Sequence, residues 1–122
     1  MSVSNGDAVF DPTTYRELFQ DALADGASWL ESYLESGADL LNKLNRARLA
    51  GDRKALRFWA HRFAGSSFLV GAMALGGVCR ALEEASDADD IEIGRLLGNV
   101  REALGTARTE IEQFVALAVE PI

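Results

Sequence analysis

Residues 91–119, IEIGRLLGNVREALGTARTEIEQFVALAV, carry the clearest pattern in this sequence of 122 residues. Apolar residues recur there at alternating steps of four and three, at Ile93, Leu97, Val100, Leu104, Ala107, Ile111, Phe114 and Ala118. Positions in this register form one continuous apolar seam along a helix, which is typical of helices packed in a bundle. The stretch therefore predicts a long helix that packs against several others.

The chain before this helix shows helical periodicity and no alternating strand pattern. A first short helix is predicted with Asp11 as its N-cap and Pro12 as its first helical residue. The residues ADG at 24–26 predict a break, and a long helix is expected from about 27 to 50. The apolar stripe of that helix is Leu30, Leu34, Ala38, Leu41 and Leu44.

Two more helices are predicted between this helix and the last one. Asp52 is expected to cap a helix over about 53–70, which Gly71 interrupts. A fourth helix is expected over about 72–85, followed by a turn.

A chain of this length is expected to form one domain. The pattern predicts an all-α fold, an up-down antiparallel four-helix bundle with an additional short N-terminal helix. We place the bundle domain at residues 11–120 and a flexible N-terminal tail at residues 1–10.

The net charge of −7 argues against non-specific binding of nucleic acid, because such binding needs a basic surface. Most basic residues nevertheless lie in one window of the sequence, which contains a single acidic residue, Asp52. They are Lys43, Arg46, Arg48, Arg53, Lys54, Arg57 and Arg62. This basic window indicates either a local acidic partner or a solvated helix face, and the charge pattern favours neither.

The only cysteine, Cys79, excludes an intrachain disulfide and is expected to be a small buried apolar residue. The first ten residues lack the basic and apolar regions of a signal peptide. Residues 63–79 carry no charge, but glycines and serines interrupt them and they are too short to span a membrane. We therefore expect a cytoplasmic protein without membrane insertion.

The only histidine, His61, is predicted to face outward from the third helix. The core side of that helix is expected to hold Leu56, Trp59, Ala60, Phe63, Ser67 and Val70. At about 100° per residue, His61 lies about 140° from this direction. Gly65 lies beside it one turn later, and the same outer side holds Lys54, Arg57, Phe58 and Phe68. Glycine inside a helix costs about 1 kcal/mol relative to alanine, so Gly65 indicates that something bulky approaches the imidazole.

A single histidine limits the chemistry of such a site. Zinc needs three or four ligands, and the chain offers one histidine and one cysteine, so no metal site is expected. Ser66 and Ser67 point away from His61 on a helix, which argues against a serine hydrolase. An acid–base enzyme using His61 and Glu83 would need an enclosed pocket. The remaining role is a nucleophilic ring nitrogen that carries a group between larger partners.

The stretch from His61 to Glu83 reads H-x-F-x-G-S-S-x-x-x-G-A-x-x-L-x-x-x-C-x-x-L-E. It resembles the signature of histidine-containing phosphotransfer (HPt) domains, with matches at His61, Gly65, Ser66, Ser67, Gly71, Ala72, Leu75, Cys79, Leu82 and Glu83. The resemblance implies a phosphorelay intermediate of two-component signal transduction. His61 would take a phosphoryl group on Nε2 from an aspartyl phosphate of one receiver domain and pass it to the aspartate of another.

The resemblance also implies partners and roles for individual residues. The expected partners are response-regulator receiver domains or a hybrid histidine kinase. The chain itself is expected to be a monomeric phosphocarrier, without autonomous catalysis and without a cofactor of its own. The receiver supplies Mg²⁺. Glu83 would hydrogen-bond the other imidazole nitrogen. Gly65, Ser66 and Arg62 would give room and support to the phosphoryl group. The expected docking residues are Phe58, Phe68, Lys54, Arg57 and Ala64.

Ala64 is the one clear departure from the family pattern, because the family usually has a lysine there to neutralise phosphate. Arg62, Lys54 and Arg57 are the candidates to supply the missing charge. The departure keeps a second hypothesis open, a helical adaptor that binds receiver domains or kinases through the same face without transferring phosphate.

Overall fold

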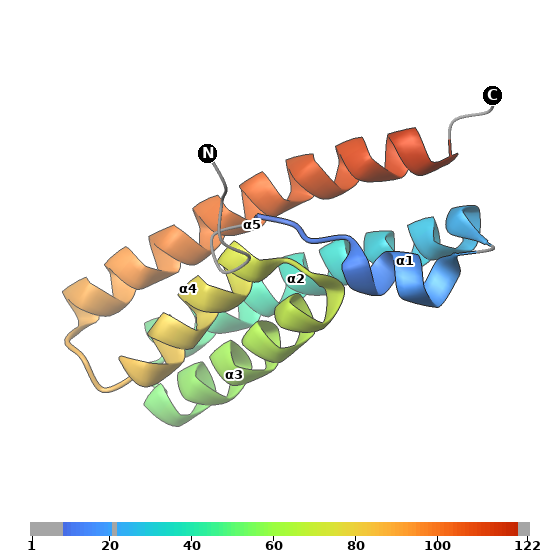
Figure 1. The fold of residues 1–122 in the computed structure, drawn as a ribbon. Coiled ribbons are helices and arrows are strands. Elements are labelled where there is room, and N and C mark those ends of the chain that lie inside the picture. Colours follow the sequence, from blue (N-terminus) through green and yellow to red (C-terminus); the bar gives the residue numbers. More distant parts are fainter. Residues whose placement is uncertain (1–8, 21, 120–122) are drawn as a thin grey trace.

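The structure is a computed structural model, and it describes residues 9–20 and 22–119. This part of the chain contains helices and no strands, which confirms the predicted fold class. The helices are α1 (Thr13–Phe19), α2 (Leu23–Leu49), α3 (Arg53–Val70), α4 (Met73–Glu84) and α5 (Asp90–Val119). Figure 1 shows α2 to α5 as an up-down bundle, with α1 lying against one end of it.

The order of the helices around the bundle determines which faces of α3 are free. Helix α3 packs against α2 and α4, and α5 packs against the same two helices. Helices α3 and α5 are therefore diagonal partners on opposite sides of the bundle (Figure 1). The outer face of α3 lies between α2 and α4 and away from α5.

The apolar seam of α5 lies in the core as predicted. Its residues from Ile93 to Ile111 are buried, and Phe114 and Ala118 are half-buried at the end near α1. In α2 the expected stripe is partly wrong, because Ala38 is exposed. Gly37 takes the inward position instead, where a Cβ would lie 3.2 Å from Leu104 and 3.4 Å from the Phe63 ring.

The predicted break at residues 24–26 lies inside α2, so this prediction is wrong. Gly26 is helical and sits beneath the rings of α1, where a Cβ would lie 2.5 Å from Tyr15 and 2.8 Å from Phe19. The glycine therefore lets α1 pack closely on α2 and does not end a helix. The N-cap of α1 is Pro12, one residue later than predicted, although the Asp11 carboxylate still accepts the Thr13 N–H at 3.0 Å.

Both predicted ends of α3 are confirmed. The Asp52 carboxylate accepts the Ala55 N–H at 2.9 Å, and Gly71 ends the helix with a φ of 95° in the left-handed region. The N-terminal segment docks at this turn, because the Asp11 N–H donates to the Gly71 carbonyl at 2.7 Å.

The N-terminal boundary of the packed chain differs from the predicted one. Phe10 was assigned to the flexible tail, but its ring packs edge-on against Phe114, with centroids 5.4 Å apart. The packed chain therefore includes residues before 11. The rest of the predicted tail, residues 1–8, and the predicted end at residue 120 lie outside the described residues.

Candidate functional site

The site is built around a hydrogen bond between α3 and α4. His61 Nδ1 lies 2.9 Å from Glu83 Oε2, and the two side chains are 73% and 26% exposed. A carboxylate can only accept, so Nδ1 carries the hydrogen and donates it. The neutral imidazole then keeps its lone pair on Nε2. The geometry thus fixes one tautomer, with a free lone pair on Nε2 of an exposed side chain.

The surface beside His61 is open. Gly65 lies one turn later on α3, and a Cβ built there would meet no other atom within 4 Å. Its backbone is helical with negative φ, so the fold would accept a side chain at this position. Since nothing in the packing requires a glycine, its effect is to leave space next to the imidazole.

Arg62 and Ser66 lie on the α2 side of α3, whereas His61 bonds to α4. The Arg62 guanidinium is 5.7 Å from the Phe58 ring centre and 5.9 Å from that of Trp59. The Ser66 hydroxyl donates to the Phe63 carbonyl at 3.2 Å, a local helix bond. Both residues line a groove of about 330 Å³ between α2 and α3. Their support of a phosphoryl group stays a prediction.

The two predicted docking aromatics differ in their surroundings. Phe58 is 51% exposed on the outer face of α3. Phe68 is half-buried, because its ring lies on Gly76 of α4. Phe58 is thus available to a partner, while Phe68 also belongs to the seam between α3 and α4.

The comparisons with known proteins add the family. The family model for the Hpt domain matches residues 28–116, which is most of the chain. The chain belongs to the Hpt domain family. A structure search matches histidine-containing phosphotransfer protein B (HptB) from Pseudomonas aeruginosa PAO1, with 25% identity and a TM-score of 0.79, over 89% of this chain and 96% of that one. A search of curated proteins found no match. Family and fold together support a histidine phosphotransfer role in phosphorelays, as a carrier.

Ala64 does not lie on the docking face of this Hpt domain. It is 2% exposed, which contradicts its predicted place among the docking residues. Because both α2 and α4 pack on α3, the buried arc of the helix is wider than one stripe and includes Ala64. Trp59, predicted for the core, is half-buried at the edge of this arc, with the Lys43 ammonium 4.4 Å from its ring centre.

Much of the basic window is used inside the fold. Arg48 pairs with Asp90 at 3.0 Å and lowers the pKa of that carboxyl by hydrogen bonding to it. Arg57 donates to the Ser86 hydroxyl at 2.9 Å and lies 3.2 Å from Asp87. Arg53 donates to the backbone carbonyls at 86 and 88 in the same loop. These residues hold the turn between α4 and α5, so the window is only in part a free basic surface.

Sequence reasoning missed one cation next to the site, Arg80 of α4. It is exposed, and its guanidinium lies 5.0 Å from the centre of the Phe68 ring. Its position three residues before Glu83, hence on the same face of α4, was a usable signal.

Over residues 9–20 and 22–119 there is no group of three His, Cys, Asp or Glu side chains that could hold a metal ion. Cys79 is buried, as predicted, and burial raises the pKa of its thiol to about 12. Within the same described ranges, no helix is both long and apolar enough to cross a membrane.

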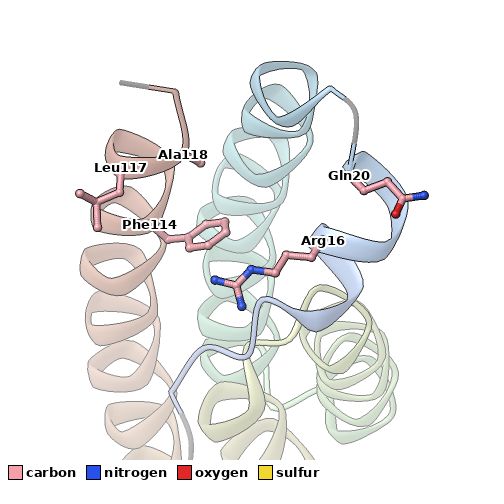
Figure 2. A pocket seen from close by; sticks show the side chains of 5 residues that line it. All are labelled: Arg16, Gln20, Phe114, Leu117 and Ala118. Atoms are coloured by element: carbon pink, nitrogen blue, oxygen red, sulfur yellow. The ribbon is translucent and has the colours of Figure 1, made fainter. Parts of the chain in front are cut away.

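A hollow of about 440 Å³ lies far from His61 along the chain, between α1 and α5. Figure 2 shows its lining residues Arg16, Gln20, Phe114, Leu117 and Ala118. His61 lines neither this hollow nor the groove beside α2. The exposed imidazole therefore argues against an acid–base enzyme, which would need to enclose its substrate.

Proposed function

We propose that this Hpt domain is a phosphorelay intermediate that carries the phosphoryl group on His61 Nε2. The group comes from the aspartyl phosphate of one receiver domain and goes to the aspartate of another. The observation that carries the proposal is the 2.9 Å contact between Nδ1 and Glu83, because it leaves Nε2 as the free nucleophile on an exposed surface.

The transfer needs no proton movement on this chain. The Nε2 lone pair attacks phosphorus, and the bond from phosphorus to the aspartate oxygen breaks, its electron pair staying on the carboxylate. The ring becomes an imidazolium that keeps its Nδ1–H on Glu83, whose negative charge compensates the new positive charge. In the onward step the second aspartate attacks phosphorus, and the pair of the N–P bond returns to Nε2.

The receiver is proposed to supply Mg²⁺ and the groups that stabilise the moving phosphoryl group. An exposed helix face excludes little water and offers few preorganised donors, so the histidine domain acts as carrier rather than catalyst. The proposed docking face consists of Phe58 and Lys54, together with the accessible parts of the Phe68 and Arg57 side chains. Its positive charge complements the acidic phosphorylation pocket of a receiver.

The relay is tested with two receivers. The protein is first labelled with [³²P]phosphate from a charged receiver domain, purified, and mixed with each uncharged receiver of the source organism in turn. We expect rapid loss of label to one or a few cognate receivers, and no initial labelling of the His61→Gln variant. Binding of receivers without any transfer of label would contradict the proposal and favour the adaptor.

A further inference from the structure

The seam between α3 and α4 has a defined register. His61 faces Glu83 across it, and Phe68 faces Gly76, where a Cβ would lie 2.7 Å from the Phe68 ring. Phe68 is two turns after His61, and Gly76 is two turns before Glu83, as antiparallel helices require. Between these two contacts, the same register sets Arg80 opposite Ala64.

Arg80 is held on the surface of this seam by a small stack. Gly76 has no side chain, so the Phe68 ring lies against the backbone of α4 at that point. The ring in turn carries the Arg80 guanidinium, 5.0 Å above its centre. A long flexible side chain is thereby kept on the outer surface of the seam between α3 and α4, the seam that also holds the His61–Glu83 bond.

The charge of Arg80 is not neutralised by the chain itself. Among the described residues no carboxylate pairs with it, whereas Arg57 pairs with Asp87 and Lys43 with Asp39. Arg62 lines the groove on the α2 side of α3. Lys54 is also unpaired in this part of the chain, but it lies two turns before His61, away from Gly65. Among the described residues, Arg80 is therefore the unpaired cation on the α4 side of His61, one turn away in register.

A phosphoryl group on Nε2 creates a need for such a cation. It brings negative charge close to the Glu83 carboxylate, which already occupies the other ring nitrogen. A guanidinium offers a fork of N–H donors that matches phosphate oxygens. The Arg80 guanidinium lies on Phe68, two turns from His61, but its backbone is at the level of Ala64, one turn from His61. The side chain would therefore turn from Phe68 toward His61 to reach the phosphate, with no movement of the backbone.

We propose that Arg80 is the phosphate-binding cation of this domain and does from α4 what a lysine at position 64 would do from α3. The proposal rests on the proposed function of His61. It explains how the buried Ala64 is compatible with phosphotransfer, because the charge comes from the opposite helix at the same level of the bundle.

The experiment uses potassium phosphoramidate, a small donor that phosphorylates histidine without a receiver. Nε2 attacks phosphorus, and ammonia leaves with the electron pair of the N–P bond. The rate of phosphohistidine formation is followed by ³¹P NMR for the wild type, Arg80→Gln and Arg80→Lys. Arg101→Gln is the matched control, since Arg101 is exposed on α5, diagonal to α3. Thermal unfolding checks that each variant is folded.

We expect Arg80→Gln to react about tenfold more slowly than the wild type, which corresponds to ~1.4 kcal/mol in the barrier. Arg80→Lys should keep most of the rate, because it keeps the charge, and Arg101→Gln should react normally. A normal rate for Arg80→Gln, or equal losses for the glutamine and lysine variants, would overturn the role of Arg80. A wild type that reacts with phosphoramidate but never with a charged receiver contradicts the proposed function and leaves the Arg80 result standing.

Discussion

The imidazole of His61 on α3 is held by the carboxylate of Glu83 on α4, with 2.9 Å between Nδ1 and Oε2. The bond joins two helices that pack closely on each other. The two side chains are therefore already ordered before a partner binds, which lowers the entropy cost of binding. The bond also determines which ring nitrogen keeps its lone pair, Nε2.

Removal of the Glu83 carboxylate should slow phosphotransfer without abolishing it. A hydrogen bond to a charged group contributes about 1.5 kcal/mol, so Glu83→Ala should lower the transfer rate about tenfold. Glu83→Gln keeps an acceptor for Nδ1–H without the charge and should fall between the alanine variant and the wild type. Single-turnover transfer from a charged receiver measures the rates. An unchanged rate in Glu83→Ala would show that the bond is not used.

Replacement of Gly65 should separate folding from function. The position is helical and open, so Gly65→Gln should stabilise the fold by about 0.5–1 kcal/mol while its side chain blocks the approach to His61. Thermal unfolding and phosphoryl uptake are measured together. Gly105→Gln is the matched control, because Gly105 is an equally open helical glycine on α5. It should gain similar stability and keep normal uptake, and normal uptake in Gly65→Gln would argue against the clearance role.

The buried pair of Tyr33 and Ser67 should matter for stability alone. The two hydroxyls lie 2.6 Å apart between α2 and α3, and burial raises the pKa of the Tyr33 phenol. Tyr33→Phe leaves the Ser67 hydroxyl buried without this partner and should cost about 1–2 kcal/mol in urea unfolding. The double variant Tyr33→Phe/Ser67→Ala should lose less than the sum of the single losses. Strictly additive losses would mean that the two hydroxyls do not interact in solution.

The Cys79 thiol should be inert in the folded protein. Its pKa is raised by burial from 9.0 to about 12, so the thiolate is scarce at pH 8 and the sulfur is covered. A thiol reagent such as DTNB should react far more slowly with the native protein than with the urea-unfolded chain. The folded state also holds this proton more tightly than the unfolded state, so this contribution to stability is complete below pH 9 and declines as pH rises toward 12. Rapid reaction of native protein at pH 8 would contradict this assignment.

The sequence predicted features that depend on one helix at a time. The seam of α5, the cap at Asp52 and the turn at Gly71 follow from local patterns, and the structure confirms them. Features that depend on how two helices meet were missed. Gly26 suggests a helix break from the sequence alone, but in the structure it allows a close contact with α1. Ala64 is buried because two helices pack on α3, and a helical wheel of α3 alone does not show this.

Arg80 illustrates the same limit at the site. On its own helix it is an ordinary exposed charge, three residues before Glu83. Its place opposite Ala64 follows only from the pairing of α3 with α4, which the contacts of His61 with Glu83 and of Phe68 with Gly76 define. A search of the sequence near His61 alone could not find it.

The central claim is that His61 Nε2 accepts the phosphoryl group. Its most direct test is incubation of the protein with a [³²P]-charged receiver and Mg²⁺, followed by measurement of the stability of the transferred label in acid and alkali. We predict an acid-labile, alkali-stable label of up to one group per chain on the wild type, assigned to Nε2 by ³¹P NMR, and no label on His61→Gln. Equal labelling of His61→Gln, or a label attached to Nδ1, would contradict the account.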